Sequence, residues 1–105
     1  MLRQDLPIAN QLDCIGALKA LSEETRMRIV GLLLKEPLDV GGIARQLGAS
    51  QYNVSKHLRI LREAGLLKVQ KQGRQRLYAL HESLRGRVSS RHAVLDLGCC
   101  NFQFD

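Results

Sequence analysis

The stretch that decides the fold of this chain is ASQYNVSKHLRILREAGLL, residues 49–67. Val54, Leu58 and Leu61 recur at helical spacing, which puts them on one apolar face of an α-helix. Gly65 stands where a left-handed residue would end that helix. The opposite face is polar and carries Gln51, Tyr52, Ser55, Lys56 and Arg59. One face is therefore expected to join a core, and the other is free to contact a partner.

A second, shorter helix is predicted directly before this stretch. Ser50 or Ala49 occupies the N-cap position of the longer helix. Upstream, Asp39 can cap a helix over residues 40–47, which Gly48 would end. Two helices joined by a glycine-containing turn of three or four residues form a helix-turn-helix, whose second helix enters the major groove of DNA.

A β-hairpin is predicted after the longer helix. Residues 66–80, LLKVQKQGRQRLYAL, alternate apolar and polar side chains on both sides of Gln72-Gly73. The tip of this hairpin carries Lys71, Arg74 and Arg76. A cationic hairpin that follows a helix-turn-helix is a wing, suited to a phosphate backbone or a minor groove.

The remaining segments complete one domain. Ile8–Leu21 has helical apolar spacing after a polar arm, and a further helix follows a cap at Ser22 and runs until Pro37. Residues 81–98 are interpreted as one or two helical pieces, followed by a short extended tail. The fold expected is mainly α with a small β-hairpin, a dimeric winged helix-turn-helix. We expect a single domain over 1–105, with an N-terminal arm and first helix (1–21), helix-turn-helix (40–65), wing (66–80) and C-terminal segment (81–105).

The net charge of +6 is confined to one third of the chain. Residues 50–80 hold seven basic residues against the single acid Glu63, so the rest of the chain sums to zero. A localised positive surface indicates a polyanionic partner, and nucleic acid is favoured over an anionic membrane. No basic helix carries the bulky apolar face of a membrane-surface helix, and no apolar run approaches the roughly 20 residues of a membrane span. A cytoplasmic location is expected.

Candidate DNA contacts lie on the polar face of the longer helix and at the hairpin tip. Gln or Asn pairs with adenine and Lys reaches guanine, whereas arginines such as Arg59 are better placed to hold phosphates. His57 has an alternative role in packing against the previous helix. Arg62 likewise has an alternative role, in a structural ion pair with an acid such as Glu36. The candidates are Ser50, Gln51, Tyr52, Asn53, Ser55, Lys56, His57, Arg59, Lys71, Arg74 and Arg76.

The three cysteines are too few and too unevenly spaced for a secreted disulfide framework. Cys99 and Cys100 are adjacent, so their side chains point to different faces of a helix or strand and at least one is accessible. Thiolates select soft metals or oxidants. We therefore expect these thiols to sense a chemical signal, which is arsenite or another soft metal, an oxidant or a reactive sulfur species.

The order of these elements and their amino-acid sequence resemble those of the ArsR/SmtB family of bacterial winged-helix repressors. ALSEETRMRIVGLLL, residues 20–34, adds to the match. The resemblance implies a homodimer that is held through its first and last helices, binds an inverted-repeat operator and releases it when an inducer binds. The residues that carry the match are Ser50, Gln51, Val54, Ser55, His57, Leu58, Leu61, Arg62, Ala64, Gly65, Leu66, Gly73 and Tyr78.

Two metal sites known in that family do not match this sequence. The Cys-x-Cys type of motif is replaced by Leu38–Gly42, which holds no cysteine. Another group of the family binds zinc through Asp and His residues on a C-terminal helix, and the Asp and His residues of this sequence do not have the spacing of that site. His92 with Asp96 is interpreted as a solvated polar pair. Because the family packs the first helix on the C-terminal segment, Cys14 is a candidate third thiol, with a small buried apolar role as the alternative.

The function expected is a sequence-specific DNA-binding repressor, released from its operator by an inducer sensed at Cys99, Cys100 and, less directly, Cys14. No cofactor is required, and arsenite or another soft metal ion is a candidate inducer. The alternative is a ligand-independent architectural DNA-binding protein with structural cysteines. A thiol redox enzyme is disfavoured, because no Gly-rich phosphate loop occurs and no C-x-x-C follows a strand.

Overall fold

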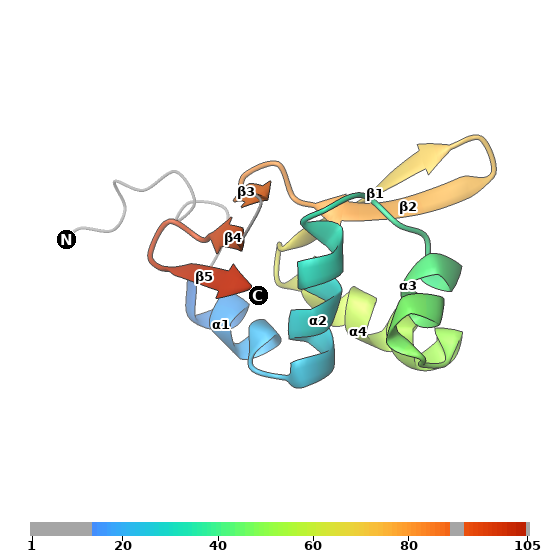
Figure 1. Cartoon of the computed structure of the whole chain (residues 1–105), viewed down its shortest axis with the longest axis horizontal. Coiled ribbons are helices and arrows are strands. Elements are labelled where there is room, and N and C mark those ends of the chain that lie inside the picture. The colour runs from blue at the N-terminus through green and yellow to red at the C-terminus, as the bar shows by residue number, and fades with distance from the viewer. Residues whose placement is uncertain (1–13, 89–91, 105) are drawn as a thin grey trace.

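The computed structural model describes residues 14–88 and 92–104, which form four helices and five strands (Figure 1). The predicted arm and the first part of the predicted helix Ile8–Leu21 lie outside the described residues. The elements, in chain order, are α1 (Cys14–Leu21), α2 (Glu24–Leu33), α3 (Val40–Leu47), α4 (Gln51–Glu63), β1 (Leu67–Gln72), β2 (Gln75–Leu80), β3 (Arg85–Val88), β4 (Ala93–Asp96) and β5 (Asn101–Phe104).

The apolar face predicted for the longest helix is the centre of the core. Val54, Leu58 and Leu61 of α4 are completely buried, and they cluster with Ile29 of α2 and Ile43 of α3. Helix α4 begins at Gln51 because the Ser50 hydroxyl accepts a hydrogen bond from the Asn53 N–H at 3.1 Å, so Ser50 rather than Ala49 is the cap.

The helix-turn-helix forms as predicted. The Asp39 carboxylate accepts a hydrogen bond from the Gly42 N–H at 2.7 Å and so caps α3. Gly48 adopts φ +67°, a left-handed conformation that glycine reaches without steric cost, and it turns the chain into α4.

Helix α2 departs from its prediction at both ends. Its N-cap is Glu23, whose carboxylate accepts a hydrogen bond from the Arg26 N–H at 2.9 Å. The Ser22 hydroxyl instead donates to the Lys19 carbonyl at the end of α1, at 2.7 Å. The helix ends at Leu33, before the expected stop at Pro37.

The wing is the antiparallel hairpin β1–β2. Gln72 pairs with Gln75, so the two-residue turn is Gly73-Arg74 rather than the predicted Gln72-Gly73. Gly73 has φ +62°, as the first residue of such a tight turn requires. At the base of the wing, Tyr78 exchanges two backbone hydrogen bonds with Leu38, at 2.8 and 3.1 Å, and this anchors β2 to the segment that leads into α3.

The predicted helical pieces in residues 81–98 are wrong. That segment forms β3 and β4, which join β5 in a three-stranded antiparallel sheet of order β3-β4-β5. Side chains alternate along β4 and just beyond it, since Ala93, Leu95 and Leu97 are buried, whereas Val94 and Asp96 between them are half-buried. The extended tail predicted after Gly98 is confirmed as β5. The sheet β3-β4-β5 therefore occupies the place in the chain where the family resemblance implied a last helix.

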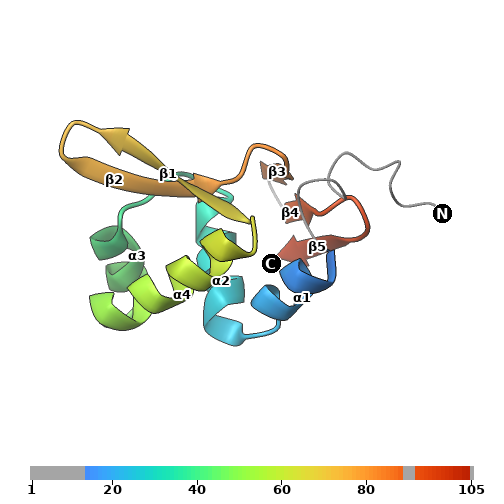
Figure 2. The same cartoon turned by 180° about the vertical axis from the view of Figure 1, so that it is seen from behind.

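The C-terminal sheet lies beside α1, at the end of the molecule away from α3 and the wing tip (Figures 1 and 2). Phe102 and Phe104 of β5 pack against the helical core. Gly31 of α2 makes room for this contact, because a Cβ at that position would lie 3.2 Å from Cδ2 of Phe104. The fold is a mainly α winged helix-turn-helix with a small β-hairpin, and the second sheet is an addition that we did not predict.

Candidate nucleic-acid interface and cysteine cluster

The N-terminal half of α4 presents an exposed polar surface. Tyr52 is 73% exposed, and the Lys56 ammonium lies 5.5 Å from the centroid of its ring, which holds both side chains above the helix. Ser50 is exposed, but its hydroxyl is engaged as the helix cap. Gln51, Asn53 and Ser55 are also exposed. The residues predicted to reach base edges are therefore accessible.

His57 points toward α2. Its Nδ1 lies 3.2 Å from an Nη of Arg26 and 3.8 Å from a carboxylate oxygen of Glu23, and its side chain is mostly buried. This arrangement favours the packing role over base contact. The pKa of Glu23 is lowered, first by the hydrogen bond from the Arg26 N–H and then by the charges of His57 and Arg26, while burial opposes the shift.

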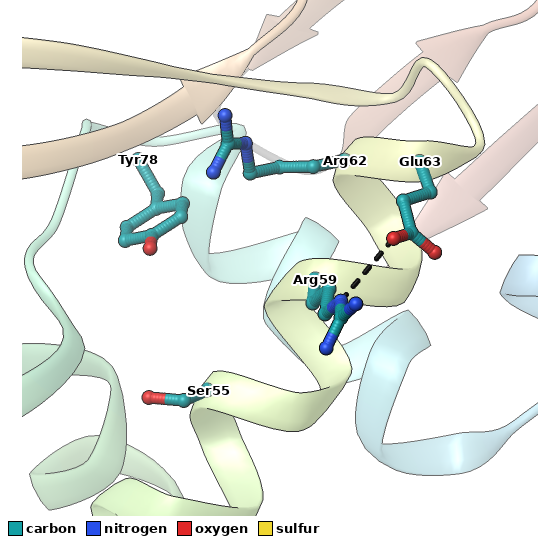
Figure 3. A pocket seen from close by; sticks show the side chains of 5 residues that line it. All are labelled: Ser55, Arg59, Arg62, Glu63 and Tyr78. Carbon is teal, nitrogen blue, oxygen red and sulfur yellow. Dashed lines mark hydrogen bonds and ion pairs between the residues drawn. The ribbon is translucent and has the colours of Figure 1, made fainter.

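Arg59 and Arg62 differ in their partners. Arg59 donates to Glu63 at 3.2 Å in an exposed ion pair one turn along the helix. The side chain of Arg62, for which a structural ion pair was one of two expectations, makes neither an ion pair nor a hydrogen bond within residues 14–88 and 92–104. It lines a hollow of about 410 Å³ between α4 and the wing (Figure 3). The hollow is lined by Ser55, Arg59, Arg62, Glu63 and Tyr78.

Arg62 and Tyr78 line this hollow together, which sequence reasoning did not predict. A signal existed for Arg62, because Ser55, Arg59 and Arg62 follow the i, i+4, i+7 spacing of one helix face. No local signal existed for Tyr78, since its position opposite α4 depends on how the wing folds back against the helix-turn-helix.

The wing tip holds a concentrated positive charge. Lys71, Arg74 and Arg76 are all exposed, and the strand register sets Lys71 directly opposite Arg76. Like charges directly across a strand pair destabilise a hairpin, and a bound anion would relieve that repulsion. At the base of the wing, Lys68 donates to Glu82 at 2.6 Å, and this bond lowers the pKa of the Glu82 carboxyl.

Cys14 meets the adjacent pair Cys99 and Cys100, whose first member lies 85 positions later in the sequence, at the junction of α1 and the C-terminal sheet. Cys14, the first residue of α1, forms a disulfide with Cys99, with their Cα atoms 6.7 Å apart. The sulfur of Cys100, a free thiol, lies 4.0 Å from that of Cys99. Cys99 is exposed, and the other two are half-buried. We call these three residues the cysteine cluster.

Metal chemistry at the cysteine cluster depends on its redox state. With the Cys14–Cys99 bond formed, Cys100 is the one free thiol that the described residues hold, and no group of three His, Cys, Asp or Glu suited to a metal ion is found there. Reduction of the disulfide would provide three thiols, a donor set that fits a three-coordinate soft ion. The carboxylate of Asp96 accepts a hydrogen bond from the Gly98 N–H at 2.8 Å, so it serves the turn that presents Cys99.

Within the described ranges, no helix has the length and apolar character needed to cross a membrane.

Comparisons with known proteins agree with this geometry. The sequence profile described as "Bacterial regulatory protein, arsR family" matches residues 23–69, a span that includes the helix-turn-helix but none of the three cysteines. The chain is 35% identical over 81 residues to a Staphylococcus aureus cadmium resistance transcriptional regulatory protein CadC homolog, covering 76% of this chain and 67% of that protein. It is 43% identical over 70 residues to the Mycobacterium tuberculosis HTH-type transcriptional regulator CmtR, covering 67% and 59%.

Solved structures give the same result. HlyU from Vibrio cholerae matches with a TM-score of 0.62 at 35% identity, covering 66% of this chain and 75% of that chain. The transcriptional repressor BigR from Xylella fastidiosa matches with a TM-score of 0.63 at 31% identity, covering 67% and 69%. With its winged helix-turn-helix, its basic recognition face and these relatives, the chain belongs to the ArsR family of bacterial regulatory proteins and is a DNA-binding transcription regulator.

Proposed function

We propose that this chain is a transcriptional repressor in the cytoplasm that binds an inverted-repeat operator as a homodimer and releases it when the cysteine cluster reacts with an inducer. The observation that carries this proposal is the convergence of Cys14, Cys99 and Cys100 from the two ends of the described chain. Free thiols scattered by chance would not be expected to meet at the one junction where α1 contacts the C-terminal sheet.

Oxidation is the favoured inducing chemistry, because Cys14 and Cys99 are close enough to form a bond. A peroxide would take two electrons and two protons from the two thiols, leaving a disulfide and two water molecules. The exposure of Cys99 gives an oxidant access to it. A second candidate, arsenite or another soft metal ion, is supported by the sulfur of Cys100 at 4.0 Å from that of Cys99, since all three thiolates of the reduced cluster would bind such an ion.

A chain of contacts leads from the cysteine cluster to α4, the recognition helix of the helix-turn-helix. Cys14 begins α1, and near its other end the Ala20 carbonyl accepts a hydrogen bond from Nε of Arg26 at 2.5 Å. The same guanidinium lies 3.2 Å from Nδ1 of His57 on α4. A shift of α1 on oxidation or metal binding would therefore reach α4 through Arg26.

The proposed DNA contacts fall into two groups, those that read bases and those that hold phosphates. Gln51, Asn53 and Lys56 would read bases from the N-terminal half of α4. Arg59, Arg74 and Arg76 would hold phosphates. The Arg59–Glu63 pair does not oppose this, because an exposed ion pair contributes only about 0–1 kcal/mol and exchanges readily for a phosphate.

The test is a DNA-release titration of the reduced protein with arsenite, zinc, cadmium, copper(I), peroxide and persulfide, followed by fluorescence anisotropy. The wild type should release DNA with one of these classes, and the Cys99→Ser/Cys100→Ser double variant should bind DNA normally but fail to release it. Release by the double variant at the wild-type inducer concentration would disprove sensing by this pair.

Single variants separate the two chemistries. Cys100→Ser keeps the pair that forms the disulfide, so it should retain the response to peroxide, reversible by dithiothreitol, and lose the response to arsenite. Cys14→Ser should lose both responses. A Cys14→Ser protein that still responds to peroxide would remove Cys14 from the mechanism.

A further inference from the structure

We infer that the hollow between α4 and the wing is a seat for one backbone phosphate of DNA, held by Arg62 together with the hydroxyls of Ser55 and Tyr78. The inference rests on the DNA binding of the family and is independent of the proposal on the cysteines.

The side chains converge on one space from two elements. Ser55 and Arg62 project from the same face of α4, two turns apart, and Tyr78 projects from β2 opposite them. Figure 3 shows the Arg62 guanidinium reaching from the helix toward Tyr78, whose hydroxyl points toward the side on which Ser55 lies. Tyr78 is fixed by its two backbone hydrogen bonds to Leu38, so its ring is held in place before a ligand arrives.

The charge of the hollow favours a small anion. Two guanidinium groups, those of Arg59 and Arg62, line the hollow against the single carboxylate of Glu63. The guanidinium of Arg62 is without an ion pair among the described residues. A guanidinium presents paired N–H donors that match two phosphate oxygens, and two hydroxyls can donate to the same group. Every side chain that lines the hollow carries a polar group, which suits an oxyanion better than an apolar ligand.

The location favours a phosphate of DNA over a free one. The hollow lies between the recognition helix and the wing, the two elements that contact a major groove and the neighbouring backbone in a winged helix-turn-helix. A DNA strand that passes from α4 to the wing must cross this hollow. Free inorganic phosphate has the same chemistry, so the experiment must distinguish the two sources.

The primary test uses Arg62→Gln, which removes the charge and keeps most of the side chain, with the exposed Lys35→Gln after α2 as the matched control. Binding is measured against salt concentration on a duplex selected in vitro and on a random duplex. Arg62→Gln should bind both duplexes about tenfold more weakly. Its log–log salt slope should be smaller by about one unit, and Lys35→Gln should match the wild type. An unchanged slope for Arg62→Gln, in a protein that still binds DNA, would overturn the inference and leave the family function intact.

Two further variants separate phosphate binding from a structural role. Tyr78→Phe removes only a hydroxyl, so it should weaken binding while the salt slope stays unchanged. Arg62→Lys keeps a charge but loses the paired donors, so its slope should stay near that of the wild type while its affinity falls. If Arg62→Gln does not fold, Arg62→Lys and Tyr78→Phe carry the test, and wild-type affinity in both would refute the seat.

Backbone chemistry identifies the source of the phosphate. An uncharged methylphosphonate is placed at each position of the selected duplex in turn. One position in each half-site should weaken the wild type and have no further effect on Arg62→Gln. If no such position exists while inorganic phosphate binds the wild type more tightly than it binds Arg62→Gln, the hollow binds a free oxyanion and the assignment to DNA is wrong. If neither effect is seen, the hollow is not a phosphate seat.

Discussion

Glu23 serves two contacts at the start of α2, and its negative charge strengthens both. Its carboxylate caps the helix by accepting the Arg26 N–H, and it lies 3.8 Å from Nδ1 of His57. These contacts lower the pKa of Glu23 from its ordinary value of 4.5. A carboxyl whose pKa is lower in the folded state stabilises the fold above its ordinary pKa, and the effect is lost as the pH falls through the lowered value.

Glu23→Gln is therefore expected to destabilise the protein at neutral pH but not in acid. The loss at pH 7 should be about 0.3–1 kcal/mol, the usual effect of a negative charge at a helix N-terminus, because Gln keeps an oxygen that can accept the Arg26 N–H but loses the charge. The difference between variant and wild type should shrink as the pH falls below 4.5, where the wild-type carboxylate is protonated too. Urea unfolding across this range measures it, with the exposed Glu36→Gln as control. A difference that stays constant with pH would show that the charge of Glu23 does not stabilise the fold.

At the scale of elements, the contact between α2 and β5 determines where the C-terminal sheet lies. Glycine inside a helix costs about 1 kcal/mol relative to alanine, so Gly31 is unfavourable for α2 taken alone. The ring of Phe104 occupies the space that a side chain at this position would need. Because β5 begins directly after Cys99 and Cys100, this contact also positions the cysteine cluster.

Gly31→Val should push Phe104 and β5 away from α2. Forcing a larger side chain into a packed contact typically costs about 1–3 kcal/mol, so the melting temperature should fall. The Cys14–Cys99 disulfide should form more slowly under mild oxidation, as peptide mapping without reductant would detect. The matched control is Gly41→Val in α3, where a Cβ makes only an ordinary contact, 3.4 Å from Arg45. Disulfide formation at the wild-type rate in Gly31→Val would mean that β5 is held by other contacts.

The elements that were predicted correctly have local signals. Helix α4 has a three-residue apolar stripe, a cap at Ser50 and a terminating glycine within one short stretch, and the wing has its turn glycine. Strands β3 and β4 have only four residues each, too few for alternation to exclude a helix. Their identity was decided by pairing, such as that of Leu95 with Phe102, which no local pattern reveals.

The same limit applies within the interface. The exposed side chains of α4 follow from helical spacing, and so does the polar stripe that includes Arg62. The contact of His57 with Arg26 joins residues 31 positions apart, and the meeting of Cys14 with Cys99 joins residues 85 apart. Cys99 and Cys100 were identified as a candidate site because they are adjacent in the sequence, whereas Cys14 was added as a third thiol only through the family resemblance.

At the scale of the whole molecule, α1 leaves apolar surface uncovered. Ile15 is 65% exposed and Leu18 is 40% exposed, one helical turn apart on the same face. Exposed apolar surface of this kind is typical of protein–protein contacts. Family resemblance implies that a second copy covers it. Ile15 directly follows Cys14, so chemistry at the cysteine cluster would act on the edge of this dimer contact as well as on Arg26.

We expect the wild type to be a dimer at micromolar concentration and Ile15→Glu/Leu18→Glu to be a monomer, because two carboxylates from each copy would be buried in the contact. Sedimentation equilibrium measures this, with Gln46→Glu on the exposed surface of α3 as the control for added charge. The wild type should bind duplexes whose half-sites are about 10 bp apart far more tightly than a single half-site, since this spacing sets both recognition helices on one face of B-DNA. The monomeric variant should bind the two duplexes with similar, weak affinity. A wild type that sediments as a monomer, or a double variant that remains a dimer, would mean that α1 does not hold two copies together.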